Sequence, residues 1–281
     1  MVDETIEAKP GSVLLEALAS AVSRGTERLV LHGNVPPTEY DRMRCPHQAG
    51  EFPFPVKYGY ALVGRVAEGP GALKGRTVFA LHPHQALAAL SPDDVVPVPD
   101  GIPPARATLA ANLETALNVV WDSGAGPCDN VLVVGAGVVG LLIARLISKM
   151  PGANVTVCEP DEGKQDTAVA LGARFAHPAD VPVGVDIAIN ASGTAVGLAT
   201  AIEAAGLEAR VVEASWHGTN QATVPLGGAF HSQRLSIVSS QVGRLPPGRA
   251  PRWTHRRRLE AAIGLLDDPA LDGLITHEVP F

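Results

Sequence analysis

The sequence has few cysteines, few aromatic residues and no long uninterrupted apolar run, and each shortage excludes a class of protein. Its three cysteines, Cys45, Cys128 and Cys158, lie far apart, which argues against a disulfide framework and against a cysteine-rich zinc lobe. The longest apolar segment, residues 131–147, contains three glycines and an arginine. It is therefore interpreted as a strand–helix unit and not as a membrane span.

A strong positive charge is also lacking, and the start of the sequence is not expected to be a leader. The formal net charge is −7, which argues against general nucleic-acid binding. The first seven residues are acidic and have no long apolar core, so they do not resemble a signal peptide. The 281 residues, 46% of them apolar, can build one large or two ordinary domains. We expect a soluble cytoplasmic protein without a membrane partner.

The most informative stretch is a glycine turn between two apolar runs. Residues 130–144 are interpreted as a strand, a tight turn and a helix, with the turn formed by Gly135-Ala136-Gly137-Val138-Val139-Gly140. In a dinucleotide-binding unit, Gly135 permits the turn, Gly137 lets a pyrophosphate approach the backbone, and Gly140 lets the helix pack closely on the strand. The backbone N–H groups that begin the helix, near Val138 and Val139, then face the phosphates.

An acidic residue follows at the spacing that such a unit requires. Glu159 ends the next apolar run and lies nineteen positions after Gly140 (159 − 140). A carboxylate there accepts hydrogen bonds from the adenosine ribose and repels a 2′-phosphate. The sequence therefore predicts that NAD(H) is preferred over NADP(H). The alternative is a glycine-punctuated buried strand and helix that binds no ligand.

The pattern changes from short strands to alternating strands and helices along the chain. Strands are predicted at residues 13–16, 19–22, 60–66, 77–81 and 95–98, with a long irregular loop over residues 33–58. A helix over residues 104–122 leads into the glycine turn, and further strands are predicted at residues 185–190, 209–214 and 235–240. This alternation predicts a doubly wound parallel sheet. Its crevice is expected to be lined by Gly135, Glu159, Ser192, Ser215 and Ser240.

The final part contains a predicted helix and a group of arginines. Residues 254–266 place Leu259, Ile263 and Leu266 on one face, with Thr254 as the N-cap. Six arginines lie just before and within this helix: Arg244, Arg249, Arg252, Arg256, Arg257 and Arg258. They are interpreted either as a solvated surface or as a pocket for a carboxylate or phosphate of the substrate.

Three segments carry a family resemblance. Residues 23–27, Ser-Arg-Gly-Thr-Glu, stand where medium-chain dehydrogenases/reductases have Gly-x-Cys-x-Ser/Thr-Asp. Residues 58–66 stand where that family has Gly-His-Glu-x-x-Gly-x-Val, and residues 274–281 are similar to the segment after the long helix of zinc alcohol dehydrogenases. Residues 23–28, 190–193 and 274–277 most resemble the branch that contains bacteriochlorophyllide a dehydrogenase.

The resemblance implies an α/β protein with two lobes. A GroES-like β-barrel lobe is expected over residues 1–112, a Rossmann doubly wound parallel sheet over residues 113–244, and a return segment to the first lobe over residues 245–281. Family members begin with an additional strand and continue beyond the Pro-Phe ending with a helix and a closing strand. The barrel lobe is accordingly expected to be shortened at both termini, leaving an open edge or a pocket floor that a partner subunit covers.

The resemblance also implies a site without zinc. The positions of the three catalytic zinc ligands are occupied by Arg24, Tyr60 and Ala111, which cannot supply the usual thiolate, imidazole and carboxylate. Thr26 matches the family's proton-relay hydroxyl. Arg24 and Tyr60 could donate hydrogen bonds to a developing alkoxide. The alternative for Arg24 is a structural salt bridge with Glu27 or Glu39. The alternative for Tyr60 is a tyrosine that is packed in the barrel.

Other titratable residues leave alternatives open. Glu114 is a candidate acid/base group, or it interacts favourably with a helix N-terminus. His47, His82 and His84 are interpreted as surface or hydrogen-bonded histidines, although the His82-x-His84 spacing would suit a metal given a third ligand. His217 and His231 are candidates to frame the nicotinamide end.

The predicted function is a zinc-independent NAD(P)(H)-dependent oxidoreductase that interconverts a secondary alcohol and a ketone, or reduces an activated alkene. The substrate is a small or mid-sized metabolite, and the arginine group would suit an anionic one. The alternative is a non-redox derivative of the fold that acts in another reaction or as a partner subunit. The family resemblance further implies a homodimer that forms through the edge strand at residues 235–240.

Overall fold

The computed structural model describes residues 5–6 and 9–280, and the chain divides into two compact units. The first unit comprises the chain up to Ala111 and the segment from Leu259 onward, and the second comprises Asn112–Arg258. Residues 245–258, which the sequence analysis assigns to the return segment, group here with the second unit. The first unit is formed by two distant parts of the chain.

The first unit is built on a five-stranded antiparallel sheet in the order β6-β1-β4-β5-β7. Its strands are β1 (Val13–Ser20), β4 (Leu62–Glu68), β5 (Thr77–Ala80), β6 (Leu87–Leu90) and β7 (Val95–Pro97). Val13 and Leu15 are fully buried while Glu16 is exposed, as expected when alternate residues face the core. The strand β6 was not predicted, because Leu-Ala-Ala-Leu lacks the β-branched and aromatic residues that favour strands.

The segment between β1 and β4 contains little regular structure, as predicted. It holds the short helix α1 (Thr26–Leu31), the 3-10 turn η1 (Pro37–Glu39) and the two-residue strands β2 (Ala49–Gly50) and β3 (Val56–Lys57). The helix α1 was not predicted, since six residues are too few to show a helical period.

The predicted helix over residues 104–122 is wrong as a single element. The chain forms α2 (Pro104–Ala107) and then α3 (Ala110–Ser123). At the break, the Thr108 hydroxyl donates a 2.6 Å hydrogen bond to the Ala105 carbonyl oxygen. Threonine hydroxyls compete in this way with the helical hydrogen bonds of the backbone.

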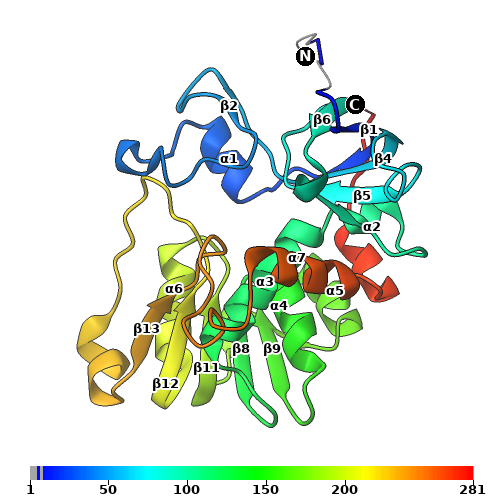
Figure 1. Ribbon diagram of the computed structural model, residues 1–281. Coiled ribbons are helices and arrows are strands. Elements are labelled where there is room, and N and C mark those ends of the chain that lie inside the picture. The colour runs from blue at the N-terminus through cyan, green and yellow to red at the C-terminus, as the bar shows by residue number, and fades with distance from the viewer. Residues whose placement is uncertain (1–4, 7–8, 281) are drawn as a thin grey trace. The chain divides into compact units, whose positions relative to one another are not determined.

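The second unit is a parallel sheet of six strands in the order β10-β9-β8-β11-β12-β13 (Figure 1). The strands are β8 (Asn130–Val134), β9 (Asn154–Cys158), β10 (Arg174–Ala176), β11 (Val185–Asn190), β12 (Ala205–Glu213) and β13 (Ser236–Ser239). The helices are α4 (Val138–Ser148), α5 (Gln165–Ala170), α6 (Ala195–Ala204) and α7 (His255–Gly264), the last crossing into the first unit. The predicted doubly wound parallel sheet is confirmed, although β10 was not anticipated.

The core of the second unit follows from near-continuous apolar strands. Leu132, Ala188 and Val211 are fully buried in neighbouring strands, and α6 covers them with Ala201 and Ile202. Parallel strands are buried on both faces, so they lack the alternation seen in β1. Short 3-10 turns and one π turn complete the chain: η2 (Pro92–Asp94), η3 (Glu162–Lys164), η4 (Pro178–Asp180), η5 (Leu226–Phe230) and η6 (Pro269–Leu274).

The predicted tail helix is confirmed with its cap. The Thr254 hydroxyl accepts a 3.1 Å hydrogen bond from the Arg257 backbone N–H, so Thr254 caps α7. Leu259, Ile263 and Leu266 are all buried, as their spacing predicts. In the part of the chain that the structure describes, no helix is long and apolar enough to cross a membrane.

Candidate functional site

The turn between β8 and α4 requires glycine at two positions and stays open at a third. Gly135 has a φ of +106°, and a Cβ there would lie 2.9 Å from the backbone of Ala191 and Ser192. A Cβ on Gly140 would lie 2.0 Å from the Gly135 carbonyl oxygen. By contrast, a Cβ on Gly137 would meet nothing within 4 Å. The turn therefore presents bare backbone at Gly137, as close approach of a pyrophosphate requires.

The start of α4 has the features of an anion site. Gly137 is its N-cap residue and provides no capping side chain, so no side chain covers the N–H groups of Val138 and Val139. These N–H groups and the positive end of the helix dipole are suited to a phosphate. The start of α4 thus has the chemistry of a phosphate site, and the role of Val138 and Val139 in cofactor binding stays a prediction.

Glu159 lies at the end of β9 and is held against the same turn. Its Oε2 accepts a 2.8 Å hydrogen bond from the Ala136 backbone N–H, and its Oε1 accepts a 3.3 Å hydrogen bond from the Asp161 N–H. The Lys164 ammonium lies 3.9 Å from Oε2. The carboxylate is therefore held beside the glycine turn by contacts within the protein.

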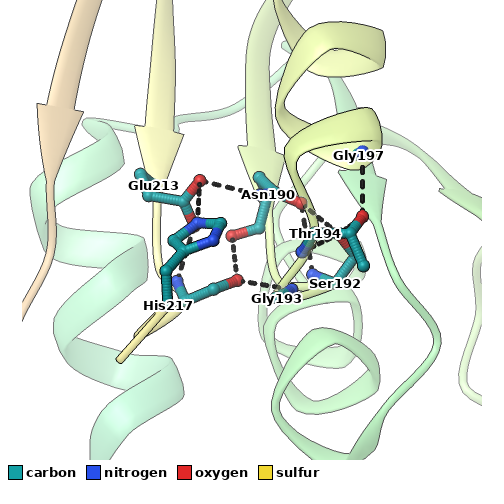
Figure 2. A network of polar contacts seen from close by, with 8 residues as sticks. Asn190, Ser192, Gly193, Thr194, Gly197, Glu213 and His217 are labelled. Atoms are coloured by element: carbon teal, nitrogen blue, oxygen red, sulfur yellow. Dashed lines mark hydrogen bonds and ion pairs between the residues drawn. The ribbon is translucent and has the colours of Figure 1, made fainter. Parts of the chain in front are cut away.

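A second polar network joins the ends of β11 and β12 (Figure 2). The Asn190 amide donates a 2.7 Å hydrogen bond to Glu213 Oε2, while Asn190 Oδ1 accepts hydrogen bonds from the Ser192 backbone N–H and hydroxyl. The Ser215 hydroxyl accepts a 2.9 Å hydrogen bond from the Gly193 N–H. The predicted residues Ser192 and Ser215 are thus brought together by this network.

The two residues at the centre of this network, Asn190 and Glu213, were not predicted as site residues. Asn190 is fully buried, and Glu213 also accepts a 2.7 Å hydrogen bond from the Ser215 N–H. The His217 Nε2 lies 3.4 Å from Glu213 Oε2 (Figure 2). A polar residue at the end of each apolar strand was the available signal, because the carboxyl ends of parallel strands share one edge of the sheet.

Ser240 and Glu114 belong to a polar ladder along α3. The Ser240 hydroxyl donates a 2.6 Å hydrogen bond to Asp122 Oδ2. Glu114 Oε1 lies 3.0 Å from Arg258 Nε, and both side chains are almost completely buried. Burial raises the pKa of Glu114, while the Arg258 charge opposes this shift. The side chains of Ser240 and Glu114 are therefore both paired with other side chains of the second unit. The roles of Ser240 in cofactor binding and of Glu114 in catalysis stay predictions.

In the first unit, two predicted catalytic residues lie together. The Tyr60 hydroxyl forms hydrogen bonds with the hydroxyl groups of Ser23 and Thr26. Burial raises the pKa of Tyr60, and the two hydroxyl partners only partly offset the shift. The phenol therefore stays protonated at neutral pH and remains a hydrogen-bond donor. The Tyr58 ring packs edge-on against Tyr60, with ring centroids 6.1 Å apart.

Beside this group lies a carboxylate–imidazole pair that the sequence analysis did not predict. Glu27 Oε2 lies 2.7 Å from His84 Nε2, and Glu27 Oε1 accepts a 2.9 Å hydrogen bond from the Ser23 N–H. The Ser20 hydroxyl lies 2.5 Å from His84 Nδ1. A Cβ on Gly59 would lie 2.8 Å from His84 Nε2, so glycine makes room for the imidazole. The pairing joins residues 57 positions apart, which no local pattern reveals.

The remaining predicted groups have different surroundings. Arg24 is exposed, and the two carboxylates proposed to pair with it bind elsewhere, Glu27 to His84 and Glu39 to Arg42. His47 lies 3.5 Å from an Asp94 oxygen.

The His82 Nδ1 lies 2.8 Å from the Pro83 carbonyl oxygen. Among the described residues, no three His, Cys, Asp or Glu side chains are grouped as a metal site would require.

The chain resembles known dehydrogenases in both sequence and structure. No protein family model matches it. A 133-residue stretch is 26% identical to 2-dehydro-3-deoxy-L-galactonate 5-dehydrogenase of Pseudoalteromonas atlantica. This match covers 43% of the present chain and 39% of that protein, so the chain matches well under half of the relative's length.

Solved structures show the fold over almost the whole chain. L-Idonate 5-dehydrogenase from Escherichia coli K-12 superposes with a TM-score of 0.74 at 14% identity, covering 95% of this chain and 83% of that one. A protein from Sinorhizobium meliloti 1021, described as a zinc-binding dehydrogenase bound to NADP, gives a TM-score of 0.71 at 18% identity, with coverages of 93% and 83%. The predicted fold, a Rossmann-like sheet with a GroES-like lobe, is confirmed.

Proposed function

We propose that this protein is an NAD(P)(H)-dependent oxidoreductase of the medium-chain type that interconverts a secondary alcohol and a ketone on a small or mid-sized metabolite. The observation that carries the proposal is the glycine turn with the Glu159 carboxylate beside it. The likeness to dehydrogenases in sequence and fold supports it. A match to the bacteriochlorophyllide branch, a cytoplasmic location and reduction of an alkene stay predictions.

Glu159 supports a preference for NAD(H) over NADP(H). Its carboxylate would accept hydrogen bonds from a ribose hydroxyl and would repel a 2′-phosphate. Lys164, 3.9 Å away, is the nearby cation that a 2′-phosphate would use once the carboxylate is removed. The cofactor preference is therefore proposed to depend on this single acidic side chain.

A titration of NADH and NADPH, followed by cofactor fluorescence, tests both claims. The native protein is expected to bind NADH more tightly, and Glu159→Ala is expected to reduce or reverse the preference, by roughly tenfold in the affinity ratio. Glu162→Ala, which removes an exposed acidic side chain of the same loop, is the matched control and should keep the native ratio. Failure of both cofactors to bind would refute the dehydrogenase assignment.

Catalysis is proposed to use the hydroxyl groups of Tyr60 and Thr26 in the first unit. When bound, a nicotinamide cofactor supplies the hydride chemistry. Tyr60 would donate a hydrogen bond to the substrate oxygen, and Thr26, which bonds to Tyr60, would pass the proton onward. Arg24 is proposed as a further donor and Glu114 as an alternative acid/base group. The Glu27–His84 pair would supply a nearby proton acceptor.

Zinc independence is part of the proposal. The residues at the expected ligand positions, Arg24, Tyr60 and Ala111, do not fit a catalytic zinc ion, because none supplies a thiolate, an imidazole or a carboxylate. Elemental analysis of the purified protein should therefore find less than stoichiometric zinc, and activity should survive a chelator. One zinc per chain would contradict the proposal.

The second candidate is a non-redox derivative that binds a dinucleotide but acts in another reaction or as a partner subunit. The substituted metal positions favour it. An assay of NADH oxidation with a broad panel of ketones distinguishes the two candidate functions. Binding of NADH without its oxidation by any ketone would favour the non-redox derivative.

A further inference from the structure

A pocket lies within the second unit, away from the glycine turn. It has a volume of about 320 Å³, which lies at the lower end of the range for small-molecule sites. Its lining includes Leu117, Val120, Trp121, Leu146, Met150 and Arg249. None of these residues belongs to the cofactor site described above.

The position of the pocket follows from the two helices that form it. Trp121 lies in the last turn of α3 and Leu146 in the last turn of α4, whereas the glycine turn precedes the first residue of α4. The helix α4 has 11 residues, so its two ends are about 16 Å apart. The pocket is therefore at the edge of the sheet where strands begin, opposite the cofactor edge.

Three side chains of the pocket lining are apolar and only partly covered. Leu117, Leu146 and Met150 are half-buried, so each leaves apolar surface open to a ligand. Trp121 forms one wall, and its ring centroid lies 4.7 Å from that of Trp253. An aromatic ring in this position can bind a hydrocarbon chain through van der Waals contacts.

The rim of the pocket carries positive charge. The Arg249 guanidinium lies 5.1 Å from the centroid of the Trp121 ring, and Arg257 lies 4.1 Å from that of Trp253. Stacking on tryptophan fixes a guanidinium in place while leaving its N–H groups at the edge available for an anion. Arg249 is thus positioned at the mouth of the pocket.

The stretch of chain that contains Arg249 is rich in arginine although the protein as a whole is acidic. Residues 214–259 contain seven arginines and no aspartate or glutamate, whereas the formal net charge of the protein is −7. Arg258 is paired with Glu114 and Arg234 with Glu208, so the charge offered to an anion at the pocket is that of Arg249.

We propose that this pocket binds an amphipathic monoanion, such as a medium-chain carboxylate, at a site separate from that of the dinucleotide. Its hydrocarbon chain lies on Leu117, Leu146 and Met150, and its carboxylate accepts hydrogen bonds from Arg249. A purely polar anion leaves these apolar side chains uncovered, and an uncharged alcohol leaves Arg249 without its partner. The combination of apolar side chains and Arg249 selects a ligand that has both parts.

Calorimetric titration with octanoate tests the proposal, with octanol and inorganic phosphate as probes of each half. We expect saturable 1:1 binding of octanoate, with weaker binding of octanol and phosphate, and a change in tryptophan emission because Trp121 forms the wall and Trp253 packs against it. Arg249→Gln should weaken octanoate binding roughly tenfold. Ala125→Leu, which fills the pocket, should abolish it.

Arg234→Gln, which removes an exposed arginine elsewhere on the same unit, is the matched control and should bind octanoate as the native protein does. Circular dichroism establishes that each variant is folded. NADH binding should be unchanged in all three variants, so this test is independent of the proposed dehydrogenase activity. Equal binding of octanoate and octanol, or native affinity in either pocket variant, would refute the proposal.

Discussion

Tyr60 is the residue on which the proposed chemistry most depends. Its hydroxyl group forms hydrogen bonds with Ser23 and Thr26, and burial raises its pKa. A phenol in these surroundings stays neutral at physiological pH and can donate to a substrate oxygen.

The substitution Tyr60→Phe is expected to lower kcat by roughly one hundredfold, because one hydrogen-bond donor to the developing alkoxide is lost. NADH affinity should not change, since the cofactor is proposed to bind to the other unit. Tyr40→Phe, in the same unit, serves as the control and should retain activity. Steady-state kinetics on any substrate found by screening measures both. An unchanged kcat in Tyr60→Phe would remove Tyr60 from the mechanism.

Cys158, next to Glu159 at the end of β9, gives a prediction about alkaline stability. Burial, assisted by the Glu159 charge, raises the pKa of the Cys158 thiol from its usual 9.0 to about 11. A pKa raised in the folded state means that the stabilisation is complete below about pH 9 and is lost as the pH rises through about 11.

The free energy of unfolding, measured with urea at pH 8 and at pH 11, should fall between these two pH values for the native protein. The fall should be about 2 kcal/mol larger for the native protein than for Cys158→Ala. Cys128→Ala, which removes the exposed thiol, is the control and should lose as much as the native protein. The same pH dependence in Cys158→Ala and native protein would contradict the expectation.

At the scale of elements, an ion pair joins two distant parts of the first unit. Arg106 in α2 donates two 2.7 Å hydrogen bonds to the Asp272 carboxylate in η6. The Arg106 side chain is 6% exposed and that of Asp272 is 55% exposed. The hydrogen bonds from Arg106 hold the pKa of Asp272 below its usual value, so the bridge stabilises the folded state above about pH 4.

Because this pKa is lowered in the folded state, the stabilisation should be lost as the pH falls from about 4 through the lower folded value. Asp272→Asn is expected to cost about 1 kcal/mol at pH 7, a figure that allows for solvent screening of the exposed carboxylate, and to flatten the acid part of the stability curve. Thermal unfolding from pH 3 to 7 measures this. Asp267→Asn, an exposed neighbour, is the control. Equal acid sensitivity of both variants would argue against the bridge.

At the scale of the whole molecule, β13 is an edge strand of the parallel sheet. Its outer backbone groups can pair with a second copy of the chain, so we propose a homodimer that forms through this edge. Light scattering should give about twice the monomer mass of 29.1 kDa.

Ser239→Lys, at an exposed position of β13, should shift the protein towards the monomer, because the two copies would bring like charges together. Ser232→Lys places the same charge outside the strand and should leave the dimer intact. A monomer at micromolar concentration in the native protein would refute the edge-pairing proposal.

The sequence by itself determined the features that depend on neighbouring residues. The glycine turn, Glu159 at the end of β9, the alternating strands and helices, and the Thr254 cap all follow from local rules of backbone geometry and periodicity. The family resemblance that the sequence carries further implies that Arg24, Tyr60 and Ala111 stand at the zinc-ligand positions, and zinc independence stays a prediction.

Only the tertiary structure decided which distant side chains meet. The Glu27–His84 pair, the Asn190–Glu213 bond and the burial of Arg258 against Glu114 join residues between 23 and 144 positions apart. The pocket beside Trp121 likewise needs the ends of two helices and Arg249 in one place. No local pattern contains these contacts, because they follow from how the strands and helices pack once formed.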